Sequence, residues 1–210
     1  MKRSFTLVEL LVVTMIIGII VAAVVPAFTR LMTGNAVSYG LRMTTSQLNM
    51  ARTEACARRK YVAVVFLDKA SNAASAYLPE NGTNIGYRCA FRSCYVTKNV
   101  SGGSASYTFE KWVPGTRWEY LPKGAYFSGD TDLPLEVKDV TDEDGLLTAG
   151  THDIRAVIFS DSGRAAEKKT FAVVVREGVV TDNKTVTRNN NADNQLTAKV
   201  NRYTGGISTE

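Results

Sequence analysis

An apolar stretch near the start of the chain limits what the protein can fold into. It runs from Phe5 to Phe28, reads FTLVELLVVTMIIGIIVAAVVPAF, and carries Glu9 as its one charge. As a helix, residues 10–28 would be about 28 Å long, close to the roughly 30 Å of hydrocarbon in a bilayer. The leading Met1-Lys2-Arg3-Ser4 is cationic, which favours a cytoplasmic N-terminus. The sequence therefore predicts a single-pass membrane segment.

Glu9 is unexpected at the head of such a segment. A carboxylate at the centre of a bilayer costs about 2.5–3.5 kcal/mol, and less near its edge. A plain signal anchor, or a secretory signal peptide cut near Ala27, gives no reason for an acid at this position. We therefore expect Glu9 to have a functional partner.

These residues resemble the N-terminus of the type IV pilin and type II secretion pseudopilin family. The family pattern is a short basic leader, a cleavage point, FTLxE and an apolar helix, and the sequence here is Lys2-Arg3-Ser4 followed by Phe5-Thr6-Leu7-Val8-Glu9. The resemblance implies that prepilin peptidase cuts between Ser4 and Phe5 and that the Phe5 amine is then N-methylated. It also implies that Glu9 pairs with the Phe5 amine of a neighbouring subunit during assembly. The family usually has Gly where this chain has Ser4.

Gly18 and Pro26 fall where helices of this family commonly carry Gly and Pro. Gly lowers helix propensity, and Pro removes a backbone hydrogen bond. Both residues are predicted to let the helix bend or locally melt in a filament.

The predicted fold class is α+β, with a long N-terminal helix packed on a β-rich C-terminal globular domain. We expect a leader at 1–4, a helix at 5–60 with its transmembrane half at 10–28, and the globular domain at 61–210. Strand patterns are clearest at 61–67, 154–160, 171–176 and 196–203, which are rich in β-branched residues or alternate. Residues 68–86 and 130–150 have the composition of loops and turns.

Three further segments are similar to the H-type minor pseudopilins of type II secretion and their pilus relatives (GspH/FimT-like). They are ARTEA at 51–55, IFSDSG at 158–163 and VNRYTGG at 200–206. The first lies at the end of the predicted helix, directly before a strand. The other two lie at turns near the C-terminus.

The three cysteines are Cys56, Cys89 and Cys94. An exported domain permits disulfides, and Cys89 and Cys94 could close a short loop across a hairpin. Buried thiols are the alternative, because the sequence does not fix connectivity. Their spacing does not suit a zinc site.

No catalytic constellation stands out. The chain has one histidine, His152, and lacks G-x-S-x-G, Walker A and H-E-x-x-H motifs, so we expect no enzyme and no cofactor. The acidic run at 139–145 lacks the spacing of an EF-hand, because Val140 occupies a ligand position. A solvated turn is therefore expected there.

Charge gives little support for nucleic-acid binding. The net charge of +5 falls to +3 when Lys2 and Arg3 leave with the leader. The basic groups at 58–60 and 168–169 are small. Nucleic acid is therefore an unlikely partner.

The sequence thus predicts a structural subunit, a minor pseudopilin of a type II secretion pseudopilus that supports protein export. Its partners would be prepilin peptidase, other pilin or pseudopilin subunits, and inner-membrane lipid before assembly. The alternatives are a minor pilin of a type IV pilus, used in adhesion or DNA uptake, and a membrane-anchored binding module that does not polymerise.

Overall fold

The structure is a computed structural model, and part of the chain is described. The described residues are 7–67, 89–122, 124–128, 133, 135–141, 147, 150–167, 169–180, 186–187 and 194–210; the side chains at 23, 25–34, 179–180 and 186–187 are not among them. Within these ranges a long helix is followed by strands. The elements are α1 (Leu7–Arg58), β1 (Tyr61–Leu67), β2 (Ala90–Ser101), β3 (Ser104–Trp112), β4 (Glu119–Tyr120), β5 (Ala125–Phe127), β6 (Leu135–Val140), β7 (His152–Phe159), β8 (Phe171–Glu177), β9 (Val179–Val180), β10 (Val186–Thr187), β11 (Gln195–Val200) and β12 (Ile207–Thr209).

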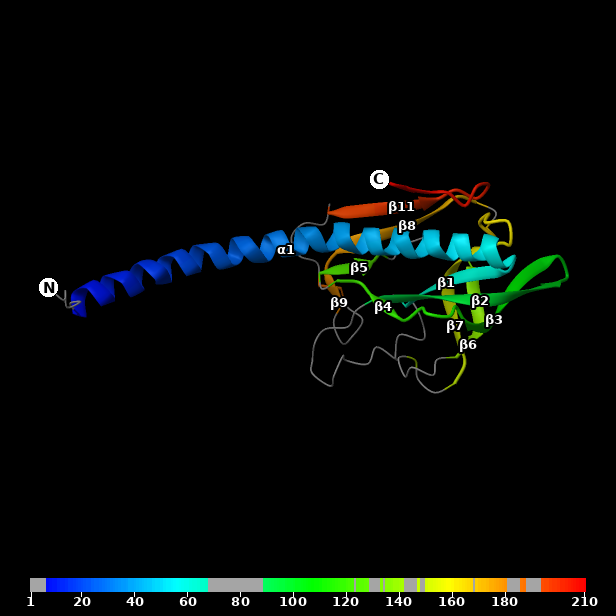
Figure 1. The fold of residues 1–210 in the computed structure, drawn as a ribbon, viewed down its shortest axis with the longest axis horizontal. Coiled ribbons are helices and arrows are strands. Elements are labelled where there is room, and N and C mark those ends of the chain that lie inside the picture. Colours follow the sequence, from blue (N-terminus) through cyan, green and yellow to red (C-terminus); the bar gives the residue numbers. More distant parts are fainter. Residues whose placement is uncertain are drawn as a thin grey trace.

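Helix α1 is a single helix whose second half lies along the β-rich body, while its first half extends beyond that body (Figure 1). The second half buries a stripe at helical spacing, with Val37, Leu48, Ala51 and Ala55 fully inaccessible to solvent. Gly40 permits a close approach here, because a Cβ at that position would lie 3.1 Å from Leu121 Cδ2. The helix-on-sheet arrangement confirms the predicted α+β fold class.

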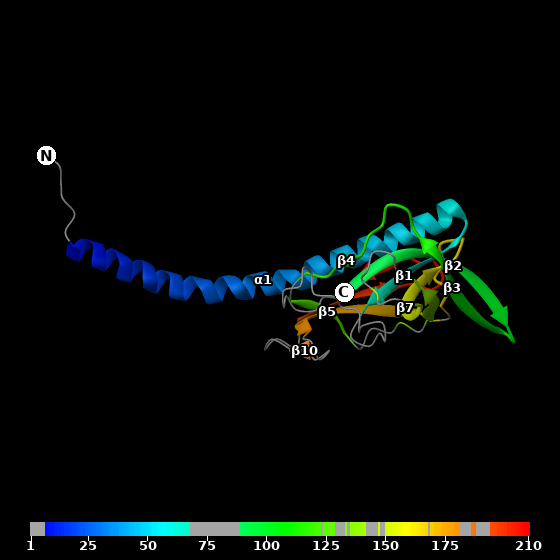
Figure 2. The same ribbon diagram turned by 90° about the horizontal axis from the view of Figure 1, so that it is seen from below.

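The larger sheet curls into a closed ring. Its strand order is β1-β7-β6-β3-β2-β4, and β1 also pairs with β2, so the first and fifth strands of this order meet. All pairings around the ring are antiparallel except β3 with β6. The smaller sheet has the order β12-β11-β8-β5 and lies against α1 (Figures 1 and 2).

Two hydrophobic cores result, because successive side chains of a strand face opposite sides of the sheet. Val62, Val64 and Phe66 of β1 face the core shared with α1 and the smaller sheet. Ala63 and Val65 face the second core, which is built from strands of the ring. Burial on both faces explains why β1 is apolar throughout instead of alternating.

The three segments that resemble H-type pseudopilins meet at the C-terminal end of α1. Arg52 Nε donates a hydrogen bond of 3.3 Å to the carbonyl of Gly163. A Cβ on Gly163 would lie 2.5 Å from Cys56 Sγ, and a Cβ on Gly205 would lie 1.9 Å from the Gly163 carbonyl oxygen. Both glycines also have positive φ, +74° and +64°. A side chain at either position is therefore disfavoured by the close contact and by the backbone conformation. We call Arg52, Cys56, Gly163 and Gly205 the glycine junction.

A polar contact fastens the same end of α1 to β2. The Tyr95 hydroxyl donates a hydrogen bond of 2.5 Å to Glu54 Oε1. The same oxygen also forms an ion pair with Arg58 Nε, at 3.2 Å. This bond, together with burial, raises the pKa of the Tyr95 hydroxyl above its ordinary value of 10.0.

Several strand predictions differ from the structure. The 130–150 region, expected as turns, contains β6, where Asp139 adopts φ of +58° at a register shift against β7. His152, just beyond this region, begins β7. The predicted loop at 68–86 lies outside the described residues.

We predict that Gly205→Ala destabilises the protein more than Gly103→Ala. Gly103 also has positive φ, +83°, but a Cβ there meets nothing within 4 Å. The control should therefore cost about 1 kcal/mol for backbone strain alone, and Gly205→Ala about 1–3 kcal/mol more for overpacking. Urea unfolding of the detergent-solubilised full chain measures both, and equal losses would contradict the packing described for the glycine junction.

A second prediction concerns alkaline pH. Because folding raises the pKa of Tyr95, its contribution to stability is present below about pH 10 and is lost as pH rises through the folded-state pKa. Tyr95→Phe should be less stable than the parent at pH 8 by about 1 kcal/mol, and the gap should narrow above pH 10. Free energies of unfolding from pH 8 to 11 measure this gap, and parallel curves would contradict the expectation.

Candidate assembly surface on the N-terminal helix

The first half of α1 presents apolar side chains to solvent. This segment extends away from both sheets in the two perpendicular views (Figures 1 and 2). Its large hydrophobic side chains are between 47% and 81% exposed. They are Leu7, Val8, Leu10, Leu11, Val12, Val13, Met15, Ile16, Ile17, Ile19, Ile20, Val21 and Val24.

These side chains occupy most positions between 7 and 24 and so face every side of the helix. A surface helix of a globular protein shows one apolar stripe, whereas a helix that is apolar all round is covered by protein or lipid. Covering each of these side chains is worth about 1 kcal/mol, and the set on the order of 10 kcal/mol. The segment therefore requires a surrounding apolar partner, and we call Leu7 to Val24 the apolar arm.

Glu9 is the acidic residue in the first turn of α1, and it is exposed among the side chains of the apolar arm. A carboxylate in the first turn interacts favourably with the helix dipole. Covering the arm with apolar material would raise the cost of this charge and strengthen its attraction to any nearby cation. The predicted cleavage and methylation residues, Ser4 and Phe5, lie outside the described residues.

The backbone of α1 is helical through both Gly18 and Pro26. A Cβ at Gly18 would meet nothing within 4 Å, so packing within the subunit does not explain glycine there. The side chain of Pro26 lies outside the described ones. The role of both residues in bending or melting the helix stays a prediction.

Among the residues that the structure describes, no helix has an apolar run long enough to cross a membrane. Parts of the predicted span at 10–28, namely 23 and 25–28, lie outside the residues whose side chains are described.

Of the two alternatives for Cys89 and Cys94, a disulfide or two buried thiols, the structure has the buried thiols. Cys89 directly precedes β2 and Cys94 lies within the same strand, and no disulfide joins them. Residues five apart along a strand face opposite sides and lie about 16 Å apart, well beyond the reach of a disulfide. Cys89 is buried in the core shared with α1, and Cys94 in the core of the ring. Burial raises the pKa of the Cys94 thiol.

The other candidate groups form no reactive site in the described part of the chain. There, no group of three or more His, Cys, Asp or Glu side chains could hold a metal. Residues 142–145 of the acidic run lie outside the described residues, as does Lys168. Of the basic group at 58–60, Arg58 pairs with Glu54, and Lys60 Nζ lies 2.9 Å from Glu110 Oε1.

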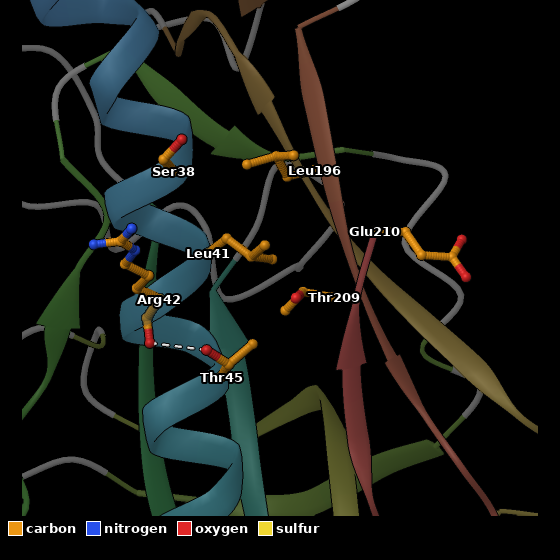
Figure 3. A pocket seen from close by; sticks show the side chains of 7 residues that line it. All are labelled: Ser38, Leu41, Arg42, Thr45, Leu196, Thr209 and Glu210. Atoms are coloured by element: carbon orange, nitrogen blue, oxygen red, sulfur yellow. Dashed lines mark hydrogen bonds between the residues drawn. The ribbon is translucent and has the colours of Figure 1, made fainter.

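A pocket of about 240 Å³ lies between α1 and the two C-terminal strands (Figure 3). Its lining residues are Ser38, Leu41, Arg42, Thr45, Leu196, Thr209 and Glu210. Sequence reasoning did not indicate this pocket, because its residues come from distant segments and carry no motif. We call it the helix–strand groove.

Comparison with known proteins assigns the N-terminus. Residues 1–25 match the family model of the prokaryotic N-terminal methylation motif. No curated protein matches the sequence. Among solved structures, the type IV minor pilin FimU of Pseudomonas aeruginosa (strain PAO1) aligns with a TM-score of 0.44 and 10% identity, over 84% of this chain and 89% of that chain.

The N-terminal segment carries a prokaryotic N-terminal methylation motif, as its residues suggested. A methylation motif at the head of a long helix that carries a β-rich domain points to a structural subunit rather than an enzyme. The motif implies processing by prepilin peptidase, membrane anchoring and assembly with other pilins.

The corrected thiol assignment predicts a labelling pattern. Cys56 is exposed, whereas Cys89 and Cys94 are buried. A maleimide should therefore modify one thiol of the native protein, and all three after denaturation without a reductant. Intact-mass measurement counts the adducts. A denatured sample that accepts only one adduct until it is reduced would show that Cys89 and Cys94 are bridged after all.

Proposed function

We propose that the protein is a minor pseudopilin of a type II secretion pseudopilus. It is anchored in the inner membrane through residues 10–28, with its β-rich domain on the outer side. Prepilin peptidase removes residues 1–4 and the new Phe5 amine is methylated. The processed subunit then leaves the bilayer and joins a filament that supports protein export.

The observation that carries this proposal is the apolar arm. Its side chains face every side of α1, and the match to the methylation motif, over residues 1–25, spans the whole arm. Lipid covers such an arm before assembly, and the helices of neighbouring subunits cover it afterwards. Transfer from one apolar surrounding to another costs little hydrophobic free energy, so specific contacts decide the direction of transfer.

Glu9 supplies such a contact. In apolar surroundings a carboxylate is attracted strongly to a cationic amine, because the local dielectric constant is low. In this proposal the partner is the methylated Phe5 amine of the adjacent subunit. The pair favours the filament because it forms only there.

The glycine junction supports the H-type subclass within the family. The three segments that carry the resemblance are far apart in sequence, yet Arg52, Gly163 and Gly205 meet at one point. Segments with a common structural role are expected to share a sequence pattern among relatives. A minor pilin of a type IV pilus is the alternative, because the same arm and junction would serve it equally well.

We predict that Glu9→Ala is cut and methylated but assembles poorly. Leaving the partner amine unpaired in an apolar core costs about 3 kcal/mol, which corresponds to roughly a hundredfold weaker association. Glu9→Asp keeps the charge and is the matched control, expected to retain most assembly. Filaments sheared from cells and quantified against total subunit measure the effect, and normal assembly of Glu9→Ala would remove the role given to Glu9.

The mass of the N-terminal peptide tests the processing on which the proposal depends. A peptide that starts at methylated Phe5, present only in cells with the prepilin peptidase, is the expected result. An intact Met1 or a cut after Ala27 would refute filament membership. Deletion of the gene then separates the two machines: loss of secreted proteins with normal pili indicates the pseudopilus, and loss of pili with normal secretion indicates the pilus.

A further inference from the structure

The β2–β3 hairpin and the C-terminal end of α1 lie together at the end of the molecule opposite to the apolar arm (Figures 1 and 2). The base of the hairpin is anchored in the core of the ring, where the side chain of Tyr107 is buried. The pairing of β1 with β2 begins at Tyr61 and Val96, so residues 97–101 continue past the start of β1. Among the described strands, these residues pair only with β3. One edge of β2 is therefore open here.

The hairpin turn determines which backbone groups this open edge presents. The turn at residues 102–103, where both glycines have positive φ, is closed by Ser101 and Ser104. Hydrogen-bonded positions alternate from that closing pair along the hairpin, so the N–H and C=O groups of Lys98 and Val100 point away from β3. Edge groups of this kind can accept an added strand from another chain.

Three cations around the start of β1 and the base of the hairpin have no ion-pair partner. Arg59, Lys98 and Lys111 are exposed, and no acidic side chain of the described residues forms an ion pair with any of them. Lys98 Nζ lies 5.7 Å from the centre of the Tyr61 ring, and Lys111 Nζ lies 5.9 Å from the centre of the Tyr95 ring. The two tyrosine rings therefore hold both ammonium groups beside the open edge.

Arg59 occupies a position at which glycine is favoured. It directly follows α1 with a φ of +51°, and the next N–H, that of Lys60, donates a hydrogen bond of 3.3 Å to the carbonyl of Ala55. This is the Schellman ending of a helix, whose left-handed residue is usually glycine. The helix ending therefore does not account for the arginine, whose side chain is exposed beside the start of β1.

Cations lie on both faces of the sheet at this edge. Tyr61 packs against the core of the ring, so the Lys98 ammonium over its ring lies on that face. Tyr95 belongs to the core shared with α1, and Lys60 Nζ, 5.6 Å from the centre of its ring, lies with Lys111 on the α1 face. A strand added to the edge would present successive side chains to opposite faces. Acidic side chains at successive positions would therefore meet a cation on either face.

The charge pattern suits a peptide better than a nucleic acid. Glu54 and Glu110 lie among the cations, with side chains 24% and 35% exposed, and pair with Arg58 and Lys60. A polyphosphate strand would bring regularly spaced negative charges past these carboxylates, whereas a peptide can place its acids opposite the unpaired cations alone. The unpaired N–H and C=O groups of the edge also match the spacing of a peptide backbone.

We propose that the open edge of β2 at 97–101 binds an extended, acidic segment of a different filament subunit, as an added strand whose carboxylates meet Arg59, Lys98 and Lys111. We call this site the cationic edge. The choice of partner rests on the proposed function, because a minor subunit is bordered by subunits unlike itself. The site lies at the end of the molecule opposite to the apolar arm, so the partner can bind without displacing whatever covers the arm.

A synthetic peptide tests the chemistry of the cationic edge. The probe is a short peptide with glutamates on both faces of an extended strand and threonine or valine between them, and its binding to the detergent-solubilised full chain is followed by fluorescence anisotropy. Binding should weaken as salt is added. It should weaken roughly tenfold in Lys98→Glu, because an attraction becomes a repulsion. The same peptide with glutamine in place of glutamate should not bind.

Arg42→Glu is the matched control for Lys98→Glu. It makes the same change of charge at an exposed residue of α1, about 24 Å before the helix ends. It should bind the peptide as the parent does, and an equal loss in the two variants would overturn the site. Tighter binding of a DNA oligonucleotide than of the peptide would overturn it as well.

A backbone substitution tests the strand pairing separately. Val100→Pro removes an outward N–H that β3 does not use, whereas Val100→Thr keeps it. Val100→Pro should weaken peptide binding several-fold and Val100→Thr should not, and unchanged binding of Val100→Pro would overturn the added strand. Unfolding in urea shows whether Val100→Pro folds. If it does not, a probe peptide methylated on alternate backbone nitrogens replaces it and should bind as poorly.

Photo-crosslinking in filament-bearing cells identifies the partner. A photoreactive amino acid in place of Val100 should form an adduct with an acidic segment of a different filament subunit, as read by mass spectrometry. The adduct should be lost in Lys98→Glu and retained in Arg42→Glu. An adduct with a second copy of this chain, or no adduct in filaments that contain the protein, would overturn the proposal.

The outcomes separate the cationic edge from the proposed function. Filaments that contain the protein, without peptide binding and without an adduct, overturn the cationic edge and leave the role of Glu9 intact. Peptide binding that depends on salt and on Lys98, in a protein that never enters a filament, overturns the proposed function and the identity of the partner while the strand site itself stands.

Discussion

The structure depends on a single helix, α1, whose N-terminal part needs an apolar surrounding and whose C-terminal part packs on the sheets in water. Along the apolar arm, residues 7–24, the described side chains of α1 are apolar on every side, whereas from residue 35 onward the helix buries one stripe against the sheets and exposes the rest. The second half of α1 therefore joins the β-rich body to the apolar arm, whose exposure to water is unfavourable. Contacts of Arg52, Glu54 and Ala55, at the C-terminal end of α1, fix the position of the helix relative to the sheets.

The parts predictable from sequence were those with a strong local signal. The apolar run and the FTLVE segment predicted the helix and the motif, because few other structures place one acid in such a run. Strand β1 matched its predicted bounds, and β7, β8 and β11 came within a few residues, because β-branched side chains concentrate there. In each case the pattern of a single segment was sufficient.

The parts that were missed depend on partners distant in sequence. Strand β6 is charged and turn-like in isolation, and forms because β3 and β7 lie on either side of it. Cys89 and Cys94 suggested a loop, but residues 90–101 form one strand, and its buried part, 90–96, lies between the two cores. The helix–strand groove joins residues 38–45 to 196–210, and no local pattern signals such a meeting.

The glycine junction also orders events in time. A chain that is made and exported from its N-terminus delivers α1 first, then Gly163, and Gly205 near the end. Until Gly205 packs against the Gly163 carbonyl, the glycine junction at the end of α1 is incomplete. Helix α1 is therefore complete in the growing chain long before the body that orients it. If the proposed function holds, a subunit that lacks its last residues would carry the apolar arm without a fixed body, and would be a poor competitor for a place in the filament.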